Sequence, residues 1–287
     1  MIDLSWLGGI EFASFIHELT SKVLIDWGSF GKLELNAQFY TGLLAIFGVN
    51  IILSGDNAVI IALAVAKLPK RQRMFGILFG TGLAIVLRII LTFVVAKLLG
   101  IPLLKLVGGA LILYIAVKLF TEGHDESGEE AANLWAALKT IVIADVIMSL
   151  DNVLAVAAAA KGDNFLILFG LVTSIPLVVA GSALLSELMR KYPIIVTIGA
   201  AILGYVGGGM MITDLGVTNF LHSAFGGALT EPAVMEIYPL FGGEVELRDI
   251  FVPVNYLKWT FEAIFTAAVV VVGKHLVKKN SEKAASA

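Results

Sequence analysis

Hydrophobic residues run along this chain in long stretches, which short polar connectors separate. A helix that crosses the hydrocarbon core of a bilayer needs about 20 mainly apolar residues. Six or seven stretches reach this length, and the alternating pattern typical of a membrane β-barrel is absent. We place seven predicted spans, at Thr41–Ala66, Met74–Leu99, Ile101–Phe120, Leu134–Ala160, Phe165–Met189, Pro193–Thr213 and Tyr256–Val277. The pattern therefore predicts an all-α, polytopic membrane protein.

Residues 1–39 differ from the rest because charged and apolar positions are mixed within them. They begin MIDLSW and lack the basic segment that opens a secretory signal peptide. We expect an amphipathic arm that lies at the membrane interface. A poorly ordered leader is the alternative.

Basic residues gather after the first, fifth and seventh predicted spans, which seven spans would place on one side. They are Lys67, Lys70, Arg71, Arg73, Arg190, Lys191, Lys274, Lys278 and Lys279. Because lysine and arginine mark the cytoplasmic side, we expect an inner (plasma) membrane protein with its N-terminus outside and its C-terminus inside. The acidic loop at 121–133 then lies in the cytoplasm, and the loop at 214–255 lies outside.

Two parts of the chain repeat each other. Residues 50–58 read NIILSGDNA, residues 145–153 read DVIMSLDNV, and both contain Ser-x-Asp-Asn. We infer that residues 40–120 and 134–213 are two copies of a three-helix unit, and that 256–287 form an extra helix and tail. Because three is odd, the copies enter the membrane from opposite faces, which is a recurrent transporter architecture.

Three carboxylates fall within predicted spans: Asp56, Asp145 and Asp151. A carboxylate at the bilayer centre costs about 2.5–3.5 kcal/mol on insertion scales, so such residues are expected to be functional. Neutral oxygen ligands nearby are Asn50, Ser54, Asn57, Ser149 and Asn152.

Helical spacing organises these side chains. Asn50, Ser54 and Asn57 form one i, i+4, i+7 stripe, and the second copy repeats it. Asp56 is about 100° away from its stripe on a regular helix. We expect a local break of the helix at Gly55 to turn Asp56 inward.

A site rich in oxygen and free of sulfur and imidazole suits hard divalent cations such as Mn²⁺, Mg²⁺ or Ca²⁺. Sodium ions and protons remain open. The structural alternative is that these residues only join helices by hydrogen bonds.

Several other polar residues lie in or near the spans. Arg88 is either a counter-charge or gating group for the acidic site, or a side chain that reaches the headgroups. We expect Glu262 to form a solvated i, i+4 pair with Lys258 rather than to bind metal. Glu187 and Asp214 lie near span ends and are expected to be exposed.

Small and hydroxyl residues are expected to serve packing. Thr81 and Thr173 either line a pathway or, as we expect, bond to the backbone of their own helix. The cluster Gly204, Gly207, Gly208 and Gly209 predicts a smooth face for close helix packing.

The composition agrees with a chain that lies in lipid. Of 287 residues, 58% are hydrophobic even without glycine, whereas a soluble domain has about 45–50% with glycine included. The net charge of −3 without a dominant basic cluster excludes a nucleic-acid partner. The absence of cysteine excludes thiolate chemistry, and no catalytic motif or prosthetic-group site is present, so we expect no enzyme.

At the paired Asp-Asn motifs, the sequence resembles the TerC family of integral membrane proteins. The matching segments are VNIILSGDNAVIIALA at 49–64 and ADVIMSLDNVLAVAAAA at 144–160. The resemblance implies a seven-helix protein of the LysE-like transporter group, associated with Mn²⁺ efflux and tellurite resistance. It also implies an acidic site at Asp56, Asp145 and Asp151. Asn50 stands where members often have an acidic residue, and this variant is typical of the YjbE-type branch.

We therefore expect a Mn²⁺ exporter that works by alternating access, with proton coupling left open. One alternative is a membrane scaffold that takes part in metallation of exported enzymes or in metal stress. Another is a Ca²⁺ or Na⁺ exchanger. The expected partners are the bilayer and a divalent metal ion, and assembly into a homo-oligomer is left open.

Overall fold

The computed structural model describes residues 37–98, 101–124, 133–160, 164–237 and 246–286. Some side chains inside these ranges lie outside the description, including those of Asn50 and Asp151. Most of the predicted N-terminal arm and the centre of the acidic loop at 121–133 also lie outside the described residues.

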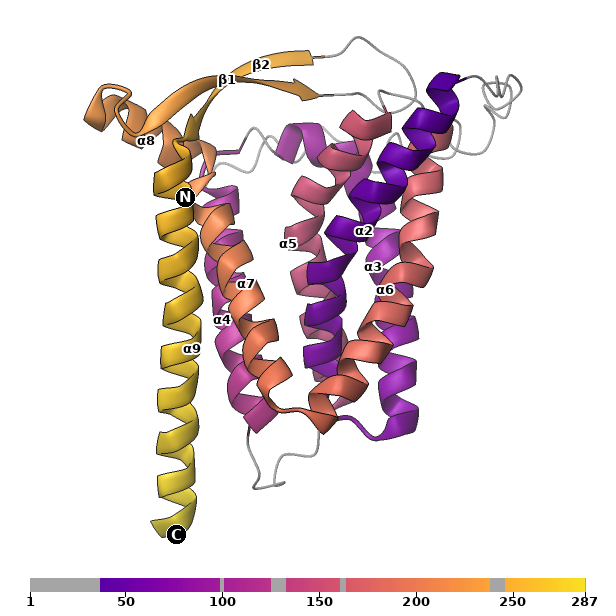
Figure 1. Ribbon diagram of the computed structural model, residues 1–287, viewed down its shortest axis with the longest axis vertical. Helices are drawn as coiled ribbons and strands as arrows, with labels where there is room; N and C mark the ends of the chain where they lie inside the picture. Colours follow the sequence, from indigo (N-terminus) through magenta and orange to yellow (C-terminus); the bar gives the residue numbers. More distant parts are fainter. Residues whose placement is uncertain (1–36, 99–100, 125–132, 161–163, 238–245, 287) are drawn as a thin grey trace, which may run out of the picture.

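Long helices dominate the described part of the chain, and they agree with the predicted spans to within a few residues at most ends. They are α2 (Ala37–Val65), α3 (Lys70–Leu98), α4 (Leu104–His124), α5 (Leu134–Ala160), α6 (Asn164–Lys191), α7 (Ile194–Ile212) and α9 (Asn255–Ser286). Figure 1 shows these helices alternating in direction through one bundle, with the C-terminus at the lower end. Within the described residues, α4, α6, α7 and α9 each contain a segment long and apolar enough to cross a membrane.

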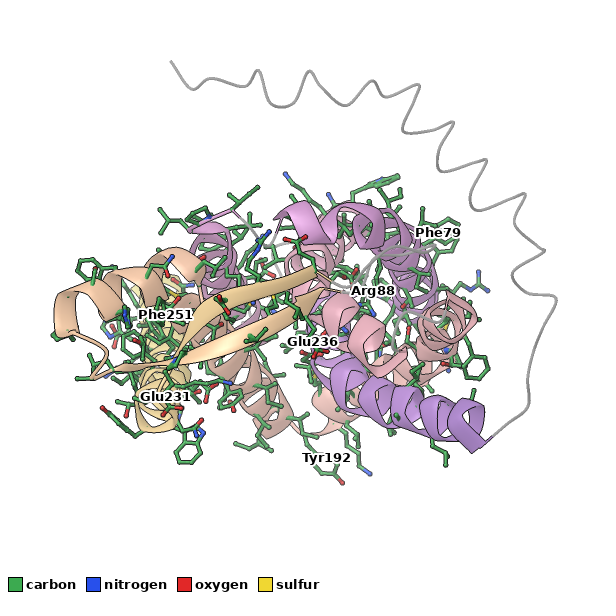
Figure 2. The ribbon with its side chains drawn as sticks, turned by 90° about the horizontal axis from the view of Figure 1, so that it is seen from above. Phe79, Arg88, Tyr192, Glu231, Glu236 and Phe251 are labelled. Carbon is green, nitrogen blue, oxygen red and sulfur yellow. The ribbon has the colours of Figure 1, made fainter. Side chains whose placement is uncertain are left out.

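The outer surface of the bundle is apolar, as a surface in contact with lipid must be. On α3, Phe75, Leu78, Phe79, Leu83 and Val86 are all about half exposed or more. Figure 2 shows Phe79 pointing away from the bundle, whereas Arg88 of the same helix lies inside it. Helix α3 is therefore apolar outward, and its inward face combines apolar residues such as Ile77 and Ala84 with the polar side chains of Thr81 and Arg88.

The main helix contacts of the first predicted repeat recur in the second. Helix α2 packs most extensively on α6, and its counterpart α5 packs most extensively on α3. Helices α2 and α5 also pack on each other, as do α4 and α7. Helix α9 stands outside this arrangement and packs on α7 and α4.

Glycines allow α7 to approach both of its main neighbours closely. A Cβ atom on Gly109 of α4 would lie 2.6 Å from the backbone oxygen of Gly207. On the α9 side, a Cβ atom on Gly204 would lie 2.9 Å from the Cα of Thr266. The predicted close packing of the glycine face is confirmed.

The segment 214–255 contains regular structure that the sequence analysis missed. It holds helix α8 (Leu215–Phe225) and strands β1 (Thr230–Ile237) and β2 (Glu246–Pro253). The strands pair antiparallel, with Thr230 opposite Pro253 and Ile237 opposite Glu246. Figure 1 shows this hairpin lying across the upper end of the bundle. The described part of the chain is thus mostly helical, with one small two-stranded sheet.

Asp214 is buried, so the expectation that it is exposed was wrong. Its carboxylate accepts hydrogen bonds from Gly216 N at 2.8 Å and Val217 N at 3.2 Å, which caps α8. It also accepts from Leu103 N at 2.9 Å and Lys105 N at 3.0 Å, at the start of α4. One carboxylate therefore satisfies the free backbone donors of two helix N-termini.

Candidate functional site

A buried ion pair joins the two predicted repeats near the middle of α5. Arg88 Nη2 on α3 lies 2.8 Å from Asp145 Oδ1, and both side chains are less than a tenth exposed. Arg88 Nε donates to Ser149 Oγ at 3.2 Å, and Ser149 Oγ donates to Asp145 Oδ2 at 3.0 Å. The three side chains form a closed triangle in which the carboxylate accepts from both neighbours.

Arg88 therefore faces the predicted acidic site and does not reach toward the headgroups. A buried carboxylate without a counter-charge is strongly disfavoured, and the guanidinium supplies that charge in a geometry suited to carboxylates. The sequence left both orientations of Arg88 open, because helical position alone does not show which face a long side chain follows.

The predicted polar stripes are buried where the structure describes them. On α5, Asp145, Ser149 and Asn152 are buried, and on α2, Ser54 and Asn57 are buried. Because α2 and α5 pack on each other, the two Asp-Asn motifs lie on neighbouring helices. The amide Nδ2 of Asn152 has no hydrogen-bond partner among the described atoms.

The helix break predicted at Gly55 is wrong. Helix α2 runs from Ala37 to Val65 without interruption. Asp56 is only partly buried, and one of its oxygens accepts from the backbone N–H of Asn57 at 2.7 Å. A regular helix thus keeps Asp56 at the edge of the stripe, as the 100° rotation per residue requires.

The remaining predicted ligands lie on the same helices. Asn50 belongs to α2 and Asp151 to α5, and their side chains are outside the description. Among the described side chains, no group of three His, Asp or Glu residues is arranged to hold a metal ion. The described site is an ion pair with neutral oxygens around it and one further carboxylate, that of Asp56, on the neighbouring helix.

Glu262 is a buried acidic residue that the sequence analysis placed incorrectly in solvent. It is only 3% exposed, and its Oε1 lies 3.9 Å from Lys258 Nζ. Its Oε1 also lies close to α7, where a Cβ atom on Gly209 would come within 3.0 Å. Its position seven residues into α9 was the available signal, since that distance places it about 10 Å from the helix end.

Comparison with known sequences gives the family. The description "Integral membrane protein TerC family" matches residues 35–282, which is most of the chain. The chain belongs to the TerC family. It is therefore an integral membrane protein, and its apolar helices agree with a multi-pass arrangement.

Three bacterial relatives illustrate the likeness. Membrane protein YjbE of Bacillus subtilis (strain 168) is 41% identical over 64% of this chain and 85% of its own length. Membrane protein YkoY of the same organism is 25% identical over 68% of this chain and 69% of its own length. UPF0053 protein YegH of Escherichia coli (strain K12) is 26% identical over 66% of this chain and 40% of its own length. No solved structure matches the chain.

Proposed function

We propose that this protein carries a divalent cation, Mn²⁺ in the first place, across the inner membrane by alternating access. The observation that carries the proposal is the buried Arg88–Asp145 pair beside the duplicated Asp-Asn motif. Ionisable groups inside a membrane protein are costly and mark ion pathways more often than structural joints. This pair also joins helices that we assign to opposite repeats.

The packing supports an inverted repeat of two three-helix units, and we propose that these six helices and α9 all span the membrane. Exchanging the two units turns the α2–α6 contact into the α5–α3 contact, and both are extensive. Counterpart helices run in opposite directions in Figure 1, as inversion requires. In such folds the substrate site lies between the repeats, which is where α2 packs on α5.

Charge balance favours a divalent cation over a monovalent one. Three carboxylates, at Asp56, Asp145 and Asp151, together with the Arg88 guanidinium carry two net negative charges. One dication neutralises that charge, whereas one sodium ion leaves a negative charge in a medium of low dielectric. Hard oxygen ligands without sulfur or imidazole favour Mn²⁺, Mg²⁺ or Ca²⁺. With Arg88 included, neutrality does not itself require a bound proton.

Arg88 gives a means of coupling cation binding to movement. A cation that binds Asp145 competes with the guanidinium for the carboxylate oxygens, so the hydrogen bond from Arg88 to Asp145 has to weaken or break. Because Arg88 belongs to α3 and Asp145 to α5, weakening this bond removes the buried ion pair that joins the two helices. Binding energy would thus shift the equilibrium between two arrangements of the helices.

The orientation that we propose places the N-terminus outside and the C-terminus in the cytoplasm. The α2–α3 junction, the α6–α7 junction and the C-terminus lie at one end of the bundle in Figure 1. The basic residues of those junctions, including Lys70 and Arg190, therefore gather at that end, as expected for the cytoplasmic side.

The test is Mn²⁺ flux into vesicles that contain only the purified protein. We expect flux with the wild type, and its loss in the variants Asp56→Asn and Asp151→Asn. Absence of flux in the wild type would favour the metallation scaffold. Flux that survives both substitutions would show that Asp56 and Asp151 do not form the cation site. Competition by Mg²⁺, Ca²⁺ and Na⁺ in the same vesicles separates Mn²⁺ export from cation exchange of another kind.

A further inference from the structure

Two buried hydroxyl groups outside the site have no hydrogen-bond partner among the described residues. Thr81 on α3 is 3% exposed and Ser186 on α6 is fully buried. Threonine and serine inside a helix ordinarily donate to a backbone carbonyl one turn earlier, as Thr173 does to Phe169 O at 2.8 Å. Thr81 therefore departs from the expectation that it would bond its own backbone. A buried hydroxyl without a partner needs an explanation, and an oxygen that serves as a ligand is one.

The two hydroxyls lie on helices that pack on each other and that correspond in the two repeats. Thr81 precedes Arg88 by seven residues, which puts both on one face of α3. Ser186 follows Ser182 by one turn of α6, and Ser182 is also buried. The buried hydroxyls thus occupy the part of α3 and α6 between the Arg88–Asp145 pair and the basic end of the bundle.

An ion pair closes the same interface at that end. Arg73 Nη1 near the start of α3 lies 3.5 Å from Glu187 Oε2 near the end of α6. The Arg73 side chain is 10% exposed and that of Glu187 is 60% exposed. Glu187 also bonds Arg190 one turn later on its own helix. Ser186 directly precedes Glu187 on α6, so the pair lies at the exposed end of this interface, and it joins helices that we assign to both repeats.

We propose that the α3–α6 interface is the cytoplasmic half of the cation pathway, and that the Arg73–Glu187 pair closes it. The hydroxyl oxygens of Thr81 and Ser186 replace water around a partly dehydrated divalent cation as it moves to or from the central site. Neutral hydroxyls suit a pathway, since they coordinate a hard cation without holding it as firmly as a carboxylate does. This inference rests on the proposed function for its substrate, but its geometry is testable without transport.

The test uses the natural absence of cysteine, which lets a single introduced thiol report on water access. Thr81→Cys and Ser186→Cys are compared with Leu83→Cys and Leu184→Cys, which lie two residues away on the outer face of the same helices. A permanently charged methanethiosulfonate reagent is added to full-length protein in inverted membrane vesicles. We expect labelling of the first two variants about tenfold faster than the controls, since the reactive thiolate forms in water and not in hydrocarbon.

Opening the ion pair and filling the pathway should change these rates in opposite directions. Adding Glu187→Gln should speed labelling of Thr81→Cys several-fold, because Thr81 lies deeper than the pair. Adding Mn²⁺ alone should slow labelling of both pathway variants. Equal labelling of pathway and outer-face thiols, or no labelling of either pathway thiol even with Glu187→Gln, would overturn the proposal.

The two proposals fail in distinguishable ways. Labelling needs no transport. If the pathway thiols label in a protein that shows no Mn²⁺ flux, the proposed pathway stands and Mn²⁺ transport is rejected. A second measurement serves if a cysteine variant does not reach the membrane. Thr81→Val and Ser186→Ala should lower Mn²⁺ flux while Mn²⁺ binding at the central site stays unchanged, whereas unchanged flux would reject a role for these hydroxyls.

Discussion

The guanidinium of Arg88 lies 2.8 Å from the carboxylate of Asp145, and this contact joins α3 to α5 inside the bundle. Both side chains are buried, so neither charge can turn to water when the other is removed. The pair is consequently a structural joint as well as a candidate part of the cation site. Its two roles can be separated by measuring stability and binding on the same variants.

Arg88→Gln should destabilise the protein strongly, because it leaves Asp145 buried without a counter-charge. Breaking a buried pair by removing one partner costs about 3–5 kcal/mol. Thermal unfolding of the purified protein measures the loss. The double variant Arg88→Gln with Asp145→Asn should recover much of it, since neither charge remains. If Arg88→Gln leaves the unfolding temperature unchanged, the pair adds no stability.

Asp214→Ala should loosen the upper end of the bundle, because the starts of α4 and α8 both lose their acceptor. Loss of one helix cap costs about 0.5–2 kcal/mol, and this residue caps two helices. Thermal unfolding together with limited proteolysis of the segment that follows measures the effect. Asn133→Ala is the control, since its side chain caps only the exposed start of α5 through Trp135 N. Equal effects of the two changes would contradict the double cap.

Gly109→Ala should separate α4 from α7, because the added Cβ would lie 2.6 Å from Gly207 O. Overpacking of this kind costs about 1–3 kcal/mol, since backbone has to move. Gly82→Ala on α3 is the matched control, as its Cβ would meet nothing within 4 Å. The control should be neutral or stabilising by up to about 1 kcal/mol through helix propensity. The unfolding temperature should therefore fall in Gly109→Ala and stay unchanged or rise in Gly82→Ala.

Glu262→Gln should keep Mn²⁺ binding and raise stability. The carboxylate is buried, its Oε2 has no hydrogen-bond partner among the described residues, and its ion pair with Lys258 is long at 3.9 Å. The hydrogen bond from Tyr205 can be accepted by the glutamine oxygen as well. Removing a poorly compensated buried charge is neutral or favourable, by about 1 kcal/mol here. Unfolding temperature and Mn²⁺ titration of the same preparation provide the two readouts. Loss of Mn²⁺ binding in this variant would place Glu262 in the cation site.

The hydrophobic pattern by itself determined that the chain is a helical membrane protein, because backbone groups in lipid must bond within their own helix. It also determined the helix positions to within a few residues at most ends. The two Ser-x-Asp-Asn stripes follow from the sequence as well, since 3.6 residues per turn decide which positions share a face. Asp214 precedes an apolar helix, which is a known signal for a helix start, but the glycines of 214–255 favoured a loop prediction for this segment.

Only the tertiary structure decided which polar groups meet across helices. The position of Arg88 on α3 did not show that it pairs with Asp145 of α5. Likewise, Glu262 is buried against α7, where Gly209 leaves room for its carboxylate. Periodicity assigns a residue to one side of its own helix, whereas the partner on that side is a property of how the helices pack.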